Sequence, residues 1–299
     1  MDQPLHNYMR PGLVVYTAFP AAARDEQVLE QRIEALAADP FFNIVELGPV
    51  PGDEGTRERL VRLLRASKLD VIYEVQPGLR AASLDLNSLD EAHRVRAVTA
   101  AMAAIDEAAA LGAERINLAS GCDPGQVDRD AATDALFESL CALAAHAATQ
   151  YRPWLALEAY PRRSSQRRLI GPTAACVELV RVVREVFPDF GITLDTGYSA
   201  LSGEDITETV AAAIPYLGQI HLGNAVPGSE LSAPRFGATG GAYDVAQVTD
   251  LLLTLFRYGF LGSGRRPPLV LRVQAAPDER PEWVIAGAKR TLVEAWMRL

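Results

Sequence analysis

The sequence predicts an α/β protein in which residues 1–299 form a single domain, a closed (β/α)8 barrel of the TIM type. Eight short apolar segments rich in Val, Ile and Leu alternate with longer, alanine-rich amphipathic segments. Continuous apolar segments of strand length are typical of parallel strands covered on both faces. Eight such strands, each followed by a helix, are the number that closes this kind of barrel. No linker or change of composition divides the chain.

Each expected strand ends at or near a Gly, Pro, Asn or other polar residue, as strands that lead into loops do. In chain order the eight are Leu13–Phe19, Phe42–Gly48, Leu69–Gln76, Arg115–Gly121, Trp154–Tyr160, Phe190–Gly197, Gly218–Ala225 and Pro267–Gln274. The intervals between them leave room for one helix after each strand.

Capping signals mark where several helices begin and end. They predict one helix that opens at Ser88-Leu-Asp-Glu91, runs through Ala110 and is closed by Gly112. A second helix has Pro172 in its first turn and runs to Phe187. Ser202-Gly-Glu-Asp205 opens another helix, and the last helix extends from Glu282 to Arg298. An open, doubly wound sheet is the alternative fold. It is disfavoured because no G-x-G-x-x-G fingerprint follows the first strand, and Gly121-Cys-Asp-Pro-Gly125 is typical of a turn.

Charge and composition exclude several classes of function. The formal net charge of −9 and the pI near 5.1 argue against a nucleic-acid surface, which needs a basic stripe to neutralise phosphates. Cys122, Cys141 and Cys176 are odd in number and lack C-x-x-C spacing, so we expect free thiols in a reducing compartment. No apolar run approaches the roughly 20 residues that span a bilayer. We therefore expect a cytoplasmic protein that binds neither nucleic acid nor membrane.

Polar side chains gather at the expected C-terminal ends of the strands, where barrels of this fold carry their chemistry. They are Glu46, Glu74, Gln76, Asn117, Ser120, Glu158, Asp195, His221, Asn224, Arg272 and Gln274. A carboxylate on an apolar strand carries a desolvation penalty unless it meets a partner, a metal or a substrate. For Glu46 and Glu74, ion pairs at the barrel mouth and contact with substrate are both open. For Asn117 and Gln76, the capping of loop backbone is the alternative to substrate binding.

At these residues the sequence resembles the xylose isomerase-like TIM barrel superfamily, the sugar phosphate isomerases and epimerases. The resemblance covers nearly the whole chain. Its carriers are Leu157-Glu158, Leu194-Asp195-Thr-Gly197, Ile220-His221-Leu-Gly-Asn224, Asn117-Leu-Ala-Ser-Gly121-Cys-Asp-Pro-Gly125, Leu169-Ile-Gly-Pro-Thr173 and Pro234-Arg-Phe-Gly237. Their order along the chain and their places on the strands are more specific together than any one motif.

The resemblance implies a divalent-metal site. In such family members, carboxylates on strands five, six and eight and a histidine on strand seven hold the metal, which stabilises an enediolate while a carboxylate removes the proton. Glu158, Asp195 and His221 match three of these positions. The fourth does not match, because Arg272 stands where the glutamate is expected, or Gln274 under a shifted register. Tyr198 also stands where the family often has histidine.

The chemistry of Arg272 determines whether the expected site can still hold a divalent metal. An arginine cannot ligate a metal and stays protonated. A positive charge about 4–5 Å from a dication would cost several kcal/mol even at an effective dielectric constant near 20. The guanidinium could instead neutralise Glu158 and Asp195, and bind a carboxylate, phosphate or enolate oxygen. We expect no metal cofactor or a weakened metal site. The alternative is that Glu158, Asp195 and His221 bind Mn²⁺, Zn²⁺ or Fe²⁺ as a three-ligand set.

The resulting expectation is an isomerase, epimerase or lyase that moves a proton on a small sugar, polyol or sugar-like metabolite. Glu158 or His221 moves the proton, Arg272 stabilises the negative charge, and Tyr198 donates a second proton or orients the substrate. The expected substrate-binding residues are Glu46, Gln76, Asn117, Asn224 and Arg235.

Two other functions are weighed against this one. A non-catalytic barrel would bind a small ligand or a protein partner at the same mouth. The endonuclease IV branch of the superfamily is disfavoured by the acidic charge and by too few histidines at strand ends for a three-metal cluster. A homodimer is an open expectation, since barrels of this superfamily often pair. The sequence does not distinguish isomerase from lyase, and it does not identify the substrate.

Overall fold

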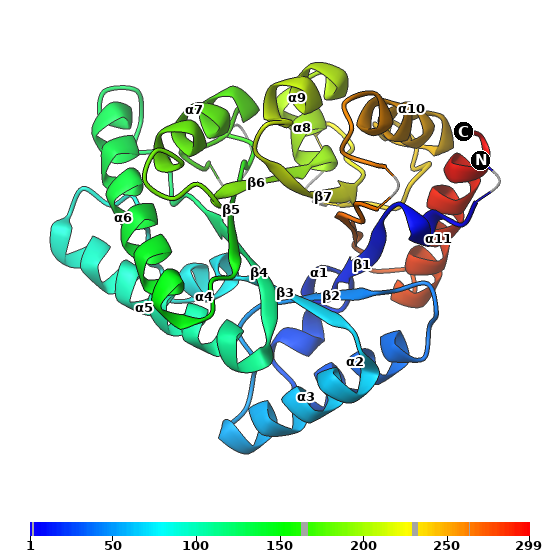
Figure 1. Cartoon of the computed structure of the whole chain (residues 1–299), viewed down its shortest axis with the longest axis horizontal. Helices are drawn as coiled ribbons and strands as arrows, with labels where there is room; N and C mark the ends of the chain where they lie inside the picture. Colours follow the sequence, from blue (N-terminus) through cyan, green and yellow to red (C-terminus); the bar gives the residue numbers. More distant parts are fainter. Residues whose placement is uncertain (2, 163–166, 229–232, 263) are drawn as a thin grey trace.

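A computed structural model describes residues 1–299 except 2, 163–166, 229–232 and 263. Eight strands form a closed barrel in chain order, and every neighbouring pair is parallel. The helices surround this ring (Figure 1). The predicted (β/α)8 fold class is confirmed.

The strands are short, and the ring closes where Arg10 to Leu13 pair in register with Pro268 to Leu271. The strands are β1 (Arg10–Val14), β2 (Ile44–Leu47), β3 (Asp70–Glu74), β4 (Ala113–Ala119), β5 (Trp154–Glu158), β6 (Gly191–Asp195), β7 (Leu217–Gly223) and β8 (Pro268–Arg272).

Eleven α-helices and two short 3-10 helices lie in the described part of the chain. The α-helices are α1 (Val15–Ala18), α2 (Glu26–Ala37), α3 (Glu54–Ser67), α4 (Gln76–Ala81), α5 (Glu91–Leu111), α6 (Arg129–Gln150), α7 (Thr173–Val183), α8 (Thr196–Ser202), α9 (Ile206–Ala213), α10 (Val245–Arg257) and α11 (Pro281–Met297). The 3-10 helices are η1 (Leu5–Asn7) and η2 (Pro20–Ala23). No described helix combines the length and apolarity needed to cross a bilayer.

The first expected strand, Leu13–Phe19, is wrong over its second half. The strand begins earlier, at Arg10, and the chain turns into α1 directly after Val14. A short apolar run has no periodicity that separates a strand from a buried helical turn, which explains the error. The other seven strands lie within two residues of the expected bounds.

The expected start of α5 is displaced by two residues, and α9 begins directly after the last residue of its expected opening segment. The N-cap of α5 is Asp90, whose carboxylate accepts from the amide of His93, and Ser88 lies outside the helix. The N-cap of α9 is Asp205. Ser202 instead ends α8. A carboxylate nearer the helix accepts the free amides of the first turn more directly than a hydroxyl farther away. Gly112 closes α5 as predicted, in the left-handed conformation with φ of 75°.

The polarity of the side chains inside the barrel changes along the barrel axis. Val14, Ile44, Ile72 and Val270 form a small apolar cluster separate from the large core between strands and helices. The N-terminal end of the ring carries Arg10, whose guanidinium reaches Asp70 on β3 at 2.5 Å and Glu114 on β4 at 2.7 Å. Polar and charged side chains occupy the other end.

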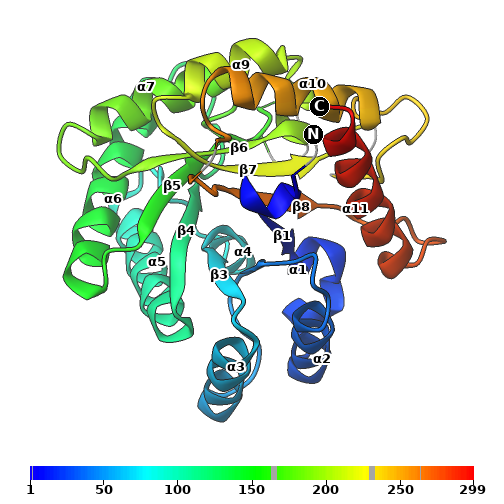
Figure 2. The same ribbon diagram turned by 45° about the vertical axis from the view of Figure 1, so that its right-hand side comes forward.

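The indole of Trp154, at the start of β5, lies across the first residues of the next two strands. A β-carbon on Gly191 would lie 2.0 Å from the indole Cζ2, and one on Gly218 would lie 2.1 Å from it. Both positions must therefore be glycine for the ring to occupy this place. At the outer wall, Trp296 donates to the carbonyl of Gln3, and the two termini lie side by side in both views (Figures 1 and 2).

Replacing Gly218 with alanine should lower the free energy of unfolding by about 1–3 kcal/mol, because the new methyl group would overpack the site against Trp154. Urea denaturation of the purified variant measures this loss. Gly287→Ala is the matched control, since a β-carbon there meets only the flexible end of Arg290 at 3.9 Å in helix α11. Equal stability of the two variants would contradict the packing described.

Candidate active site

Six strands each deliver one ionisable side chain to the C-terminal end of the barrel. They are Glu46 on β2, Glu74 on β3, Glu158 on β5, Asp195 on β6, His221 on β7 and Arg272 on β8. The pairing register sets Asp195 beside His221, and it sets Arg272 beside Gly223, two residues beyond His221 on the same strand. All six except Glu74 are buried. The structure thus brings together the expected trio of Glu158, Asp195 and His221.

His221 is held between two carboxylates. Its Nδ1 lies 2.8 Å from Oε1 of Glu158, and its Nε2 lies 2.9 Å from Oε2 of Glu46. Burial lowers the pKa of the imidazole, but the charges and hydrogen bonds of Glu46 and Glu158 outweigh it and hold the pKa well above its ordinary value. The same contact acts on Glu46. Burial raises the pKa of its carboxyl, and His221 nevertheless holds that pKa below the usual value.

Arg272 fills the space between the carboxylates of β5 and β6. Its Nη1 donates to Oδ2 of Asp195 at 2.9 Å and to Oε1 of Glu158 at 3.4 Å, and its Nη2 contacts the hydroxyl of Tyr198. Burial lowers the pKa of the guanidinium, but Tyr198 and Asp195 more than offset this, so the pKa lies well above its ordinary value. Arg272 therefore remains a cation.

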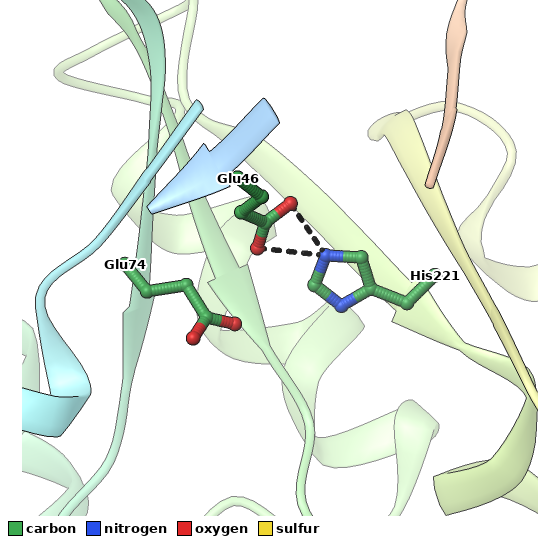
Figure 3. A group of neighbouring side chains, drawn as sticks. All are labelled: Glu46, Glu74 and His221. Atoms are coloured by element: carbon green, nitrogen blue, oxygen red, sulfur yellow. Dashed lines mark hydrogen bonds and ion pairs between the residues drawn. The ribbon is translucent and has the colours of Figure 1, made fainter. Parts of the chain in front are cut away.

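Glu74 faces the pair formed by Glu46 and His221 (Figure 3), and a hydrogen bond with Glu74 helps to lower the pKa of Glu46. Oε1 of Glu74 is buried and has no hydrogen-bond partner among the described residues. Burial, together with the charges of Glu46 and Glu158, raises the pKa of this carboxyl to about 8. Near neutral pH Glu74 can therefore take up or release a proton.

A polar layer beneath the charged groups holds Glu46 in place. Asn117 donates to Oε1 of Glu46 at 3.0 Å and accepts from Thr193 at 2.7 Å. Gln219 donates to Oε2 of the same carboxylate at 2.8 Å and lies 2.8 Å from Nε2 of His221. Gln219 is not among the residues predicted from the sequence. Its position two residues before His221, on the same face of β7, was the available signal.

Two tyrosine rings lie beside the guanidinium of Arg272. The guanidinium carbon of Arg272 lies 4.2 Å from the ring centre of Tyr198 and 5.8 Å from that of Tyr160. The two rings are 4.5 Å apart. Burial raises the pKa of the Tyr198 hydroxyl. Tyr198 therefore enters this site as a protonated phenol that contacts Arg272. Tyr160 is a further residue of the site that was not predicted from the sequence.

Three residues expected to bind substrate lie in other surroundings. Gln76 begins helix α4, and its amide oxygen accepts from Arg168 at 3.0 Å. Asn224 donates to the carbonyl of Arg235 and accepts from the amides of Ala225 and Tyr243, so it fixes the loop after β7. The side chain of Arg235 is 60% exposed and pairs with Glu279 at 3.0 Å. The structure does not bring these three into contact with the ionisable group.

Among the described residues, two sets of side chains offer ligand atoms within 4.8 Å of one another, as a divalent metal requires. One is the expected set of Glu158, Asp195 and His221, and the other is Glu46, Glu74 and His221. The first set does not fit a dication in this arrangement, because Nη1 of Arg272 contacts both of its carboxylates. The second set includes the unpartnered oxygen of Glu74, and within it Nε2 of His221 contacts Glu46.

A family model described as a xylose isomerase-like TIM barrel matches residues 33–264 of the chain. The chain therefore belongs to this family, which confirms the resemblance drawn from the strand-end motifs. No curated protein sequence matches the chain.

Solved structures with the same fold include several sugar epimerases. A D-tagatose 3-epimerase-like protein is 16% identical with a TM-score of 0.75, covering 97% of this chain and 99% of its own. An L-ribulose 3-epimerase is 19% identical with a TM-score of 0.71, covering 97% and 96%. IolI protein, solved with a zinc atom, is 15% identical with a TM-score of 0.71, covering 97% and 99%.

Replacing Glu74 with glutamine should make the protein less sensitive to alkaline pH. Between the ordinary carboxyl pKa of 4.5 and the folded-state value of about 8, the folded wild type keeps a proton that the unfolded chain has lost. Its stability therefore falls as pH rises through that range, and the variant lacks this loss. Each unit of pKa shift corresponds to about 1.4 kcal/mol.

Urea unfolding of both proteins at pH 5 and pH 9 tests this expectation. The variant should gain stability relative to wild type on going from pH 5 to pH 9. Glu58→Gln, at a side chain 68% exposed on α3, is the matched control. Parallel stability profiles for wild type and the Glu74 variant would show that this carboxyl does not carry the raised pKa.

Proposed function

We propose that the chain is an isomerase, epimerase or lyase that moves a proton on a small sugar, polyol or sugar-like metabolite. The observation that carries this proposal is a buried cation that lies among four carboxyl groups, together with two buried polar atoms that have no hydrogen-bond partner among the described residues. These atoms are Nε of Arg272 and Oε1 of Glu74. They are a donor and an acceptor that a substrate can engage.

The chemistry that suits this arrangement is removal of a proton from a carbon beside a carbonyl group. The reaction builds negative charge on the carbonyl oxygen, and a guanidinium fixed before substrate arrives stabilises that charge. Arg272 supplies this cation, since it remains protonated in the site. Tyr198, in contact with Nη2, orients the guanidinium and keeps a proton available beside the oxygen.

A carboxyl group is the better candidate for the base than the imidazole. Both ring nitrogens of His221 are engaged by carboxylates, and its raised pKa keeps the ring protonated. Glu158 bonds to His221 and Arg272, while Glu74 has a free oxygen and a pKa of about 8. A group whose pKa lies near the working pH exchanges protons most effectively. We assign the proton transfer to Glu158 and Glu74, with His221 as the group that holds Glu158 in place.

The comparisons support the substrate class. The sugar epimerases with this fold are named for D-tagatose and L-ribulose, and this chain places its ionisable side chains at the C-terminal end of the barrel. The acidic surface and the small buried site favour a small-molecule partner over a nucleic acid.

Replacing Arg272 should abolish proton exchange. In heavy water, with a panel of ketopentoses, ketohexoses and 2-keto acids, wild type should incorporate deuterium beside the carbonyl of its substrate, measured by proton NMR. Arg272→Met should lower that rate by at least about 100-fold. Arg272→Lys keeps the charge and loses the forked geometry, so its rate should be intermediate.

Arg272→Met leaves two buried carboxylates without their cation, which destabilises the fold. Arg272→Lys keeps the charge, so its rate still tests the proposal if the methionine variant fails to fold. Arg62→Met, at an exposed position on α3, is the matched control and should exchange at the wild-type rate. An unchanged rate in folded Arg272→Met would contradict the role of the guanidinium. Absence of exchange in wild type across the panel would favour the non-catalytic barrel instead.

We further propose that this site works without a resident divalent metal. Elemental analysis of protein purified without chelator should find well under one divalent ion per chain, because Arg272 occupies the space between Glu158 and Asp195. In Arg272→Glu, the repulsion among the carboxylates should make stability depend on metal, so added Mn²⁺ should raise its Tm and leave wild type unchanged. A stoichiometric ion in wild type would refute the proposal, and its loss in Asp195→Asn or in Glu74→Gln would identify the ligand set.

A further inference from the structure

We propose that the opposite, N-terminal end of the barrel carries a binding site for a phosphate-class oxyanion. A cavity of about 380 Å³ opens there beneath strands β4 to β8. Four arginines line it, and its lining contains no acidic residue. They are Arg115, Arg184, Arg265 and Arg266. In a chain of net charge −9, such a grouping indicates a site for an anion.

Arg115 is the half-buried member of this group whose guanidinium has a buried donor. Its side chain is 20% exposed, and its Nη1 is buried without a hydrogen-bond partner among the described residues. Its Nε is 3.5 Å from Glu114, but that carboxylate is already bound by both terminal nitrogens of Arg10, at 2.7 and 3.1 Å. A guanidinium that keeps a buried N–H free beside a cavity is a donor for a ligand oxygen.

The other three arginines have no ion pair with any carboxylate in the described ranges. Arg184 donates to the carbonyl of Pro215 at 3.3 Å and lies over the ring of Tyr216. Arg265 and Arg266 are exposed and directly precede β8. Forked guanidinium groups bind the oxygens of a phosphate in pairs, which favours a phosphate over a singly charged carboxylate.

The floor of the cavity is rigid and specifically built. Trp154 supports Arg115, whose guanidinium carbon lies 4.5 Å from the indole ring. The indole in turn requires glycine at positions 191 and 218, as described above. Arg115 is therefore held over an aromatic plane at the edge of the cavity, and less of its conformational freedom is lost on binding than for a free surface arginine.

The site is separate from the one at the barrel mouth, because the strands that begin at this cavity end at the other site. Strand β5 runs from Trp154 to Glu158, and β8 runs from Pro268 to Arg272. A phosphate bound at the mouth would depend on Arg272. One bound here depends on Arg115, Arg265 and Arg266, so variants distinguish the two places.

Calorimetric titration at low ionic strength, with inorganic phosphate and pyrophosphate as probes, tests the proposal. Wild type should bind both, and more tightly than acetate. The double variant Arg265→Gln/Arg266→Gln should bind at least about tenfold more weakly, the loss that corresponds to one charge-assisted hydrogen bond. Arg115→Gln should have a comparable effect. Because Arg265 and Arg266 are exposed, the double variant remains informative if Arg115→Gln fails to fold.

Arg62→Gln/Arg65→Gln on α3 makes the same change of charge away from the cavity and is the matched control. It should bind within about twofold of wild type, since distant exposed charges are screened by salt. Three results would each overturn the proposal. They are no binding by wild type, equal weakening in the control, and a self-association that depends on Arg265 and Arg266 without phosphate binding, which would assign the cavity to contact with a second copy.

Discussion

Inside the barrel, Arg272 donates to Asp195 and approaches Glu158, and these contacts determine which neighbouring groups can carry charge. A buried ion costs several kcal/mol of desolvation unless it is paired. Arg272 pairs with two of the four carboxyl groups, and His221 pairs with Glu46 and shares Glu158. Glu74 is left without such a pairing. Its raised pKa follows from burial and from the charges of Glu46 and Glu158, which are not offset by a cation bonded to Glu74 itself.

Strands β4 to β8 have opposite requirements at their two ends. At their C-terminal ends, side chains from adjacent strands must converge on a small volume, which the parallel register provides. At their N-terminal ends, glycines on β6 and β7 leave room for Trp154, and the indole supports Arg115. Strands of five to seven residues separate the two regions. The same framework thus positions an acidic group at one end and a basic group at the other.

Much of the fold and part of the site could be predicted from the sequence. The alternation of apolar strands and amphipathic helices is a local signal, and it identified seven strands within two residues. The boundary at Val14 could not be predicted, because the apolar run continues into a helical turn. Glu158, Asp195, His221 and Arg272 were identified because charged residues on apolar strands are rare.

The roles of other residues depended on long-range packing. Glu46 and His221 are 175 positions apart, and only barrel closure brings them to hydrogen-bonding distance. Asn224 and Gln76 follow or end the expected strands like ligand-binding residues, but their amides bond to nearby loops and to Arg168. Position on a strand is a local property. The partner of a polar side chain depends on which distant groups fold against it.

Asp195 uses its two oxygens for different purposes. Oδ1 accepts from the amide of Tyr198 at the start of α8, while Oδ2 accepts from Arg272. Rotation of the Asp195 carboxylate would break both bonds. The amide of Tyr198, in the first turn of α8, therefore fixes the orientation of the carboxylate and, through it, the position of the Arg272 guanidinium. A free arginine side chain has about 2 kcal/mol of rotamer entropy to lose. Here that entropy is lost when the chain folds, so ligand binding does not have to overcome it.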